Sequence, residues 1–332
     1  MTLSPLAIPR GGQVLVAGSL AFDQIMVFDG QFKDHILPEK LHVINISFLV
    51  TDMQRQRGGC AGNIGYTLAL LGERPRLIAA AGNDFSGYRT WLEEQGCDVD
   101  AIAVHDDVTT ASCFITADHD DNTITGFFPG AMARAGDLSL RERAGDHAAI
   151  AIVAPDDPAA MLRHCREARD AGLPFVFDPS FQVTNMTGPD LADAARGAAL
   201  MALNDYEYAV FKQKTGRDDA GVFELVERVA VTLGAEGSKI ADRDGGELVI
   251  PAARVDAFVE PTGAGDAWRG GLLAGLARGY DLATSGRIGS VAAAYAVEHK
   301  GPQQHSYTQD EFAARYRDNF GELPSRSGGG DR

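Results

Sequence analysis

Short apolar runs and longer amphipathic stretches alternate along most of the chain. The short runs, rich in Val, Ile and Ala, predict strands over 14–18, 77–81, 149–154, 175–178, 199–203 and 231–234. Apolar residues at helical spacing predict helices over 63–71, 86–95, 158–171, 205–215 and 263–278. Strands separated by helices are typical of crossover units, so we expect an α/β fold with a doubly wound, mainly parallel sheet and helices on both faces.

Two stretches interrupt this alternation with β-type patterns alone. The first lies between Asp23 and Arg57, with strand-like runs at 24–28 and 43–50, and the second covers 109–128 around a turn at 118–122. We expect the two to form a small β-sheet lid that closes over substrate. The chain then divides into an α/β body (13–22, 59–108 and 129–324), the lid (23–58 and 109–128) and a disordered, Gly-rich tail (325–332).

Composition and charge exclude several classes of protein. With 45% hydrophobic and 23% charged residues the chain is typical of a globular protein, and no apolar run approaches the roughly 18 residues of a membrane span. The first residues, MTLSPLAIPRGGQ, lack the apolar core of a secretory signal, so we expect a cytoplasmic protein. Four widely spaced cysteines without a C-x-x-C pair indicate free thiols rather than disulfides or a zinc site.

The charge balance also limits the partners. Lys and Arg total 30 against 46 Asp and Glu, which gives a net charge of −16 and argues against nucleic acid and membrane partners. A small anionic ligand is compatible with this charge, because local N–H groups or Mg²⁺ can hold it.

One glycine-rich turn carries candidate chemistry. Residues 260–270 read Glu-Pro-Thr-Gly-Ala-Gly-Asp-Ala-Trp-Arg-Gly and lead into an apolar helical pattern. At a helix start the N–H groups of Gly263, Ala264 and Gly265 lack intrahelical partners and form a site for an anion. The helix dipole favours the ionised form of Asp266, which makes it a general base at neutral pH. The turn thus predicts a kinase site, whereas the alternative is a capping Asp without chemistry.

Five motifs, in order along the chain, resemble those of the PfkB family of ribokinase-like sugar kinases. Gly58–Asn63 is similar to the N-terminal signature of that family, and Thr262–Asp266 is similar to its C-terminal signature. Between them stand Asp178-Pro179-Ser180, the N-x-x-E motif Asn204–Glu207, and Val231–Gly237. The resemblance spans about 14–298 and implies a ribokinase-like fold and ATP-dependent phosphorylation of a hydroxyl group.

The resemblance implies roles for individual residues. Asp266 would be the catalytic base, with the N–H groups of Gly263, Ala264 and Gly265 as the anion hole. Glu207 would organise Mg²⁺ through water, and Asn204 would lie close to the phosphates of the co-substrate ATP. The nucleotide would be bordered by Thr232, Leu233, Gly234, Gly237 and a wall at 292–297.

One departure from the family pattern concerns a cation. The C-terminal signature commonly begins with Asp-Thr, where this chain has Glu260 and Pro261 before Thr262. Residues near that position help to bind a monovalent cation in some members. The departure therefore bears on activation by K⁺ more than on catalysis.

The acceptor site is predicted where the strands of the body meet the lid. The carboxylate of Asp23, just after the first strand, can accept two hydrogen bonds from adjacent sugar hydroxyls. Gly59 permits close approach of the backbone, and the Asn63 amide can donate and accept. Aromatic faces that could sandwich a flat base stand at Phe114, Phe127, Phe128 and Phe181, although neighbours along a strand point to opposite faces.

Longer stretches resemble bacterial adenosine kinases within the family, namely 37–42, 47–50, 57–63, 127–132 and 204–207. This resemblance implies phosphate transfer to the 5′-hydroxyl of adenosine, giving AMP in purine salvage. It places Ser19, Asp23, Gly59 and Asn63 at the ribose, Phe127 at the purine, Gln182 near the base, and Ser47 at a pocket across a dimer interface. It also implies a homodimer through the lid, for which an exposed strand edge at 43–50 gives a physical reason.

Three alternatives stay open. The first is a kinase of the same fold that acts on inosine, guanosine, ribose or fructose 6-phosphate. The second is a non-catalytic nucleoside or sugar sensor, against which the complete Gly263–Asp266 turn argues. The third, a nicotinamide-dependent oxidoreductase, lacks its G-x-G-x-x-G fingerprint after the first strand.

Overall fold

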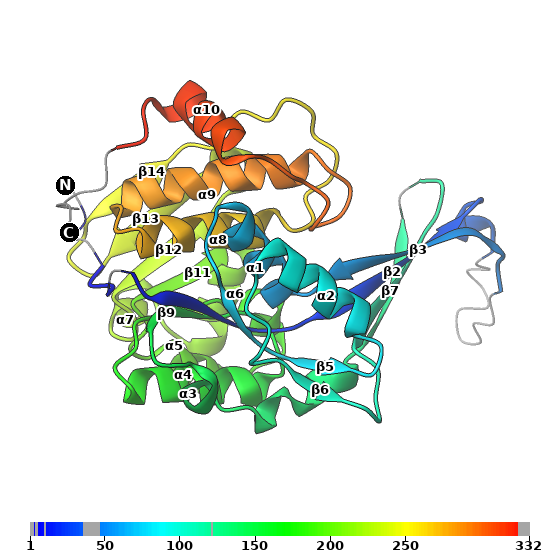
Figure 1. Cartoon of the computed structure of the whole chain (residues 1–332), viewed down its shortest axis with the longest axis horizontal. Coiled ribbons are helices and arrows are strands. Elements are labelled where there is room, and N and C mark those ends of the chain that lie inside the picture. Colours follow the sequence, from blue (N-terminus) through cyan, green and yellow to red (C-terminus); the bar gives the residue numbers. More distant parts are fainter. Residues whose placement is uncertain (1–2, 4–5, 10, 36–46, 121, 325–332) are drawn as a thin grey trace.

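The computed structural model describes residues 3, 6–9, 11–35, 47–120 and 122–324. Its centre is an eight-stranded sheet in the order β14-β13-β12-β11-β10-β9-β1-β4 (Figure 1). All neighbours from β4 to β12 pair in parallel, and β12, β13 and β14 pair antiparallel. The strands are β1 (Gln13–Ala17), β4 (Arg76–Ile78), β9 (Ala148–Val153), β10 (Phe175–Phe177), β11 (Leu200–Asn204), β12 (Arg228–Thr232), β13 (Ser238–Asp242) and β14 (Glu247–Ile250).

Helices cover both faces of this sheet, as the alternating pattern predicts. In β1, Val14 and Val16 face one layer, and Leu15 and Ala17 face the other. The first layer holds α1 (Cys60–Leu70), α2 (Ser86–Gln95), α8 (Ala264–Ala277), α9 (Leu282–Val297) and α10 (Gln309–Phe320). The second holds α3 (Leu140–Arg143), α4 (Pro158–Asp170), α5 (Gly188–Ala195), α6 (Asp205–Thr215) and α7 (Asp219–Phe223). The predicted α/β fold is therefore confirmed.

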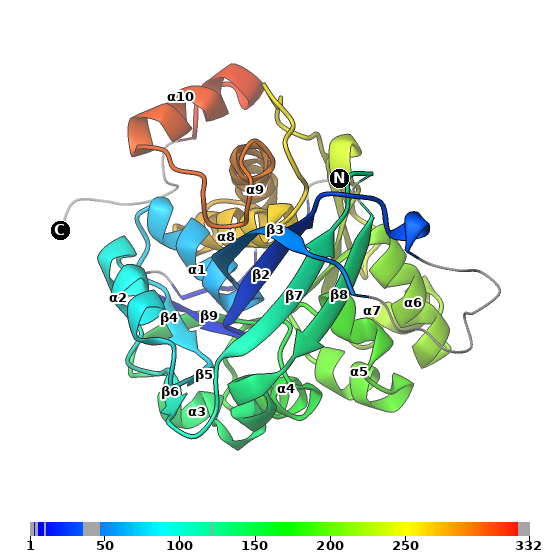
Figure 2. The ribbon, with the colours of Figure 1, turned by 90° about the vertical axis from the view of Figure 1, so that its right-hand side faces the viewer.

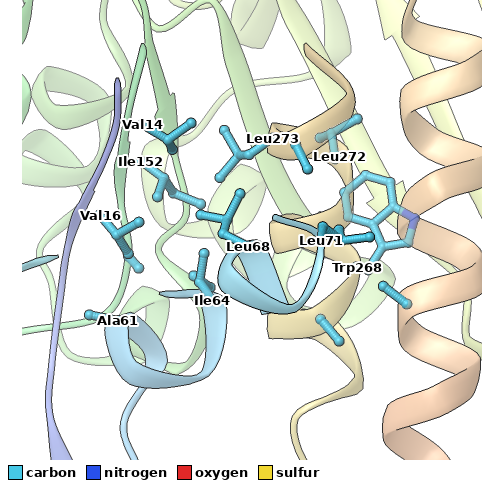
Figure 3. Close-up of a cluster of buried hydrophobic side chains, with 14 of the residues drawn as sticks. Val14, Val16, Ala61, Ile64, Leu68, Leu71, Ile152, Trp268, Leu272 and Leu273 are labelled. Atoms are coloured by element: carbon cyan, nitrogen blue, oxygen red, sulfur yellow. The ribbon is translucent and has the colours of Figure 1, made fainter. Parts of the chain in front are cut away.

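The packing of α1 and α8 on the sheet sets the positions of their first turns. Ile64 and Leu68 of α1 lie against Val14 and Ile152 of the sheet, and Leu273 of α8 completes the same cluster (Figure 3). These side chains are almost completely buried, so the two helices are held as one layer. Both helices consequently begin at the same edge of the body.

A second, smaller sheet projects from this edge and has the order β3-β2-β7-β8 (Figure 2). Its strands are β2 (Ala21–Phe28), β3 (Val50–Gly58), β7 (Ala111–Ala117) and β8 (Thr123–Phe128), and we call it the small sheet. Only three residues separate the end of β1 at Ala17 from the start of β2. A further pair, β5 (Ala80–Gly82) and β6 (Ala103–His105), and short 3₁₀ turns at Phe32–Asp34, Gly130–Asp137, Ser180–Thr184 and Gly234–Glu236 complete the described elements.

Most predicted elements are found, with one clear error in the small sheet. The helices over 86–95 and 205–215 have the predicted bounds. The strand predicted over 43–50 is wrong for 47–49, which form no strand, while 43–46 and the tail 325–332 lie outside the described residues. The strand that pairs antiparallel with β2 is β3, which starts at Val50 and is mostly polar. Within the described residues no helix has both the length and the apolar character to cross a membrane.

Candidate active site

The glycine turn at the start of α8 forms the floor of the candidate site. Gly263 has φ 80°, a left-handed conformation that favours glycine, and a Cβ there would lie 2.5 Å from Cβ of Pro302. The N–H groups of Gly263 and Gly265 have no partner within the described part of the chain. The Ala264 N–H, in contrast, donates to the Pro261 carbonyl (3.1 Å) and closes the turn. The Ala264 N–H is thus used within the turn in this structure, and the anion hole formed by all three N–H groups stays a prediction.

Asp266 lies in the first turn of α8 and faces the first turn of α1. The Nδ2 of Asn63 donates to its Oδ2 (2.8 Å). Burial raises the pKa of Asp266, and the Arg269 charge and the hydrogen bonds from Asn63 and the Cys60 thiol oppose this rise. The net direction is opposite to the one that the helix dipole alone predicts, because burial has the larger effect. A carboxylate with a raised pKa is a stronger base once ionised.

A buried ion pair lies beneath this turn. The Arg269 guanidinium contacts both carboxylate oxygens of Asp178, with Nε–Oδ2 at 2.6 Å and Nη2–Oδ1 at 2.7 Å. Its Nη2 is also 4.0 Å from Oε2 of Glu207. Burial raises the pKa of Asp178 to about 7, Arg269 lowers it, and the Asp266 and Glu207 charges raise it. Arg269 thus pairs with Asp178, lies close to Glu207, and lowers the pKa of Asp266 through its charge, so that one cation lies among three acidic side chains.

The start of α6 places Glu207 in this cluster. Asn204 caps the helix by accepting from the Glu207 N–H (2.7 Å), and Glu207 Oε2 accepts from the Asn204 N–H (2.8 Å). Ser180, with the unusual φ of 40°, donates its hydroxyl to Glu207 Oε1 (3.2 Å). The N-x-x-E spacing therefore has a local structural reason, and it brings the end of β11 to the acidic cluster. Among the described residues no group of three or more His, Cys, Asp or Glu is arranged so that it could hold a metal ion by itself.

A cavity of about 250 Å³ lies beside the glycine turn and is almost entirely apolar. Most of the predicted nucleotide residues line it, namely Thr232, Gly234, Gly237, Ala293, Ala294 and Val297 together with Ala264 and Gly265. Leu233 is not part of this lining, and its N–H closes the neighbouring turn on the Gly237 carbonyl (2.8 Å). Because the cavity ends at the unpaired N–H groups of α8, a base in the cavity can have its phosphates at the glycine turn.

The predicted acceptor residues lie on the other side of Asp266. Gly59 has φ 86°, and a Cβ there would approach the Ser19 carbonyl within 2.6 Å. Ser19 accepts the Cys60 N–H on its hydroxyl (3.3 Å), which joins the end of β1 to the start of α1. Asp23 packs over Gly58, where an added Cβ would lie 2.7 Å from its Oδ2. Burial and the Glu260 charge raise the pKa of Asp23 to about 6.

The register of the small sheet decides which aromatic residues share a face with Asp23. Asp23 pairs with Cys113, and Cys113 pairs with Phe127, so all three point to one face. Phe114 pairs with Gln24 and therefore lies on the opposite face. That face also carries Arg55, whose guanidinium lies 3.5 Å from the Phe22 ring centroid. Alternation along the strands therefore places Phe114 and Phe127 on opposite faces, and of the two only Phe127 shares the face of Asp23.

A model of the pfkB family of carbohydrate kinases matches residues 23–309. The chain belongs to this family. It is therefore an ATP-dependent kinase that phosphorylates a hydroxyl group. It has the ribokinase-like α/β fold of solved nucleoside kinases.

Relatives of this pfkB kinase cover nearly the whole chain. A nucleoside kinase of Methanothermobacter thermautotrophicus is 32% identical over 94% of this chain and 97% of its own length. The structure of Burkholderia thailandensis nucleoside kinase in complex with inosine has 39% identity and a TM-score of 0.83, covering 94% of this chain and 99% of that one. Methanocaldococcus jannaschii nucleoside kinase has 26% identity and a TM-score of 0.84, with 93% and 99% covered.

Two predicted residues of this pfkB kinase have their described contacts with residues outside the cluster around Asp266. Gln182 is buried, and its amide donates to the Asp156 carbonyl (2.6 Å) and accepts from Asn185 (2.8 Å). Ser47 is exposed before β3, beside Phe48, which packs on Phe28 at a centroid distance of 4.8 Å. The roles of Gln182 at the base and of Ser47 at a dimer interface stay predictions.

Three buried residues of the site escaped the sequence analysis: Arg269, Tyr88 and Gln303. A signal existed for Arg269, since it is the one charge in the apolar stretch 267–276 and a buried charge needs a partner. Gln303 donates to Asn63 Oδ1 (2.7 Å) and to the Tyr88 hydroxyl oxygen (2.6 Å). Tyr88 and Gln303 belong to none of the sequence motifs, so no motif spacing indicated either residue.

Proposed function

We propose that this chain transfers the terminal phosphoryl group of ATP to the 5′-hydroxyl of a purine nucleoside, with adenosine as the expected acceptor. The observation that carries the proposal is the row Asp23–Cys113–Phe127 across the small sheet. Asp23 can accept hydrogen bonds from a sugar diol, and Phe127 is 47% exposed two strands away, roughly 10 Å at the usual strand spacing. A bare sugar would leave this aromatic face without a partner, whereas a nucleoside presents a base to it.

Asp266 would remove the proton from the acceptor hydroxyl. That oxygen then attacks the terminal phosphorus while the bond to ADP breaks, and the unpaired N–H groups of Gly263 and Gly265 stabilise the negative charge on the transferred group. Asn63 contacts Asp266 on one side and borders the acceptor region at Gly59 on the other. This arrangement would hold the acceptor hydroxyl next to the general base Asp266.

The acidic cluster suits the Mg²⁺ that phosphoryl transfer commonly uses. The charges of Asp266 and Glu207 raise the pKa of Asp178, and a divalent cation nearby would relieve this repulsion. Mg²⁺ keeps several waters and needs few protein carboxylates, so we propose that Glu207 would help to hold it through water. When bound, it would neutralise charge on the ATP phosphates.

Inosine is a second candidate acceptor. It is supported by the Burkholderia thailandensis nucleoside kinase, whose structure contains inosine, and adenosine and inosine differ only on the purine ring. Stacking on Phe127 does not distinguish the two bases, because both present a flat face. The choice would depend on hydrogen bonds at the base edge.

The experiment measures ADP formation by the purified chain with ATP and Mg²⁺. The acceptors are adenosine, inosine, guanosine, ribose and fructose 6-phosphate, each tested in K⁺ and in Na⁺ buffer, with Asp266→Asn as the control. Turnover confined to purine nucleosides supports the proposal. The ratio of kcat/KM for adenosine to kcat/KM for inosine decides which of the two is the preferred acceptor. Preference for ribose or fructose 6-phosphate would refute it, and tight nucleoside binding without ADP formation would favour a sensor.

We also propose that the chain pairs into a homodimer through the small sheet. Apolar side chains on and beside its outer strands are exposed, with Leu49 82%, Met53 64% and Ile124 49% accessible. Such residues favour an interface between copies. Light scattering of the purified chain should give twice the chain mass of 35.3 kDa, and Met53→Lys should reduce it to a single chain.

A further inference from the structure

The loop between α9 and α10 reaches the candidate site from the side of the body. Its Gly301 N–H donates to Glu260 Oε1 (2.9 Å), and Pro302 packs against Gly263 of the glycine turn. The next residue, Gln303, is only 3% exposed. The loop is thus fixed against the start of α8 and presents one buried amide to the site.

This amide is the middle of a chain of hydrogen bonds. Gln303 Nε2 donates to Asn63 Oδ1 (2.7 Å) and to the Tyr88 oxygen (2.6 Å). The Tyr88 hydroxyl donates to the Gly58 carbonyl (3.0 Å), and Asn63 Nδ2 donates to Asp266 Oδ2 (2.8 Å). Three side chains therefore connect a backbone carbonyl of the N-terminal signature to the carboxylate of the C-terminal signature.

The direction of every bond follows from the Gly58 carbonyl. A carbonyl can only accept, so Tyr88 donates to it and uses its own oxygen to accept from Gln303. The nitrogen of Gln303 then faces Asn63, which must present its oxygen to Gln303 and its nitrogen to Asp266. A reversed Asn63 amide would set two nitrogen donors against each other and an oxygen against the Asp266 carboxylate.

The N-terminal signature leaves space for this chain of bonds. A Cβ on Gly62 would lie 2.9 Å from Gln303 Nε2 and would overlap the Tyr88 hydroxyl. Gly62 is in the first turn of α1, one residue before Asn63. A side chain at this position would displace the two residues that orient Asn63.

We propose that Gln303 is a positioning residue for phosphoryl transfer, acting through Asn63. By fixing the Asn63 amide it keeps one N–H on Asp266 and leaves the second N–H for the acceptor hydroxyl. This inference rests on the proposed function, in which Asp266 is the base. Gln303 itself touches neither substrate, so it is expected to affect kcat far more than the KM for ATP.

The test compares Gln303→Met, which removes the donor, with Gln304→Met on the exposed neighbouring residue. Gln303→Met should lower kcat about tenfold or more with the best acceptor, because the base and the hydroxyl lose their alignment. The KM for ATP should change less than twofold, and Gln304→Met should match the parent chain. Thermal unfolding of each variant checks that it is folded. If Gln303→Met does not fold, Gln303→Glu, which replaces the donor with an acceptor, takes its place in the comparison.

A double-mutant cycle separates positioning from general damage. In the Asn63→Ala background, Gln303→Met should reduce kcat less than twofold further, because its effect requires the Asn63 amide. An equal loss of kcat in both backgrounds, an unchanged kcat in Gln303→Met, or a rise in the KM for ATP that accounts for the whole loss would overturn the inference. Failure of the proposed function would give a different result from failure of this inference, because the parent chain would then form no ADP with any nucleoside.

Discussion

Asp156, three residues after the end of β9, has a carboxyl group that should make the stability of the fold depend on pH. Its side chain is 1% exposed; Oδ1 accepts the Asp157 N–H (2.8 Å), and Oδ2 has no partner within the described part of the chain. Burial, with a smaller contribution from the Asp157 charge, raises the pKa of Asp156 from 3.8 to about 8. At pH 7 the carboxyl is therefore protonated in the folded chain and ionised in the unfolded chain.

The sign and size of the effect follow from proton linkage. Between pH 3.8 and pH 8 the folded chain binds one more proton than the unfolded chain, so the free energy of unfolding falls as the pH rises. The slope is about 1.4 kcal/mol per pH unit. Between pH 6 and pH 8 the titration of Asp156 should lower the free energy of unfolding by about 2 kcal/mol. This is slightly less than the full slope over two pH units, because half of the carboxyl groups of the folded chain are ionised at pH 8.

Asp156→Asn tests this reasoning because the amide has the shape and charge of the protonated carboxyl. The free energy of unfolding in urea is measured at pH 6 and pH 8 for the parent chain, for Asp156→Asn and for Asp146→Asn, which changes an exposed Asp. The parent and Asp146→Asn should lose about 2 kcal/mol more than Asp156→Asn over this interval. Equal pH dependence in all three would refute the reasoning.

Further predictions concern the site itself. Asp266→Asn should lower kcat by about 10²–10⁴ while nucleoside binding, measured by calorimetry, is retained, and the kcat/KM of the parent should fall as the pH drops through the raised pKa of Asp266. Phe127→Ala should raise the KM for a purine nucleoside about tenfold, whereas Phe114→Ala, equally exposed on the opposite face, should change it less than twofold. Equal effects of the two would remove Phe127 from the base site. Gly263→Ala should abolish ADP formation, because its Cβ meets Pro302, while Gly245→Ala, with the same φ of 80° and open space around it, should cost only about 1–2 kcal/mol of stability.

Local patterns carried most of the fold prediction. The apolar runs of β9 and β10 and the helix Asp205–Thr215 with its Asn204 cap are specified within a few residues, so the sequence alone located them. The β3 strand was missed because its residues are mostly polar and exposed, and its pairing with β2 uses backbone groups. Its hydrophobic pattern therefore contained no strand signal.

The candidate site likewise contains residues that the sequence predicts and residues that it does not. The motifs around Asn63, Glu207 and Asp266 were identifiable, and the structure brings all three to one edge of the sheet. The face on which Phe114 lies depends on strand register, and the hydrogen bond of the Ala264 N–H to the Pro261 carbonyl depends on how one turn closes. Gln303 could not be predicted, because its bond to Asn63 exists only after two distant segments have packed together.

The hydrogen bond between Asn63 and Asp266 spans 203 residues of sequence, and the bond between Gln303 and Asn63 spans 240. Contacts between such distant residues form late in folding, since a long loop must close before they are gained. During synthesis, the first two thirds of the chain would emerge with the acceptor residues present but without their base. A nascent or C-terminally shortened chain could hold part of the acceptor site yet transfer no phosphate, so catalytic competence would begin only when α8 and the loop that carries Gln303 have docked.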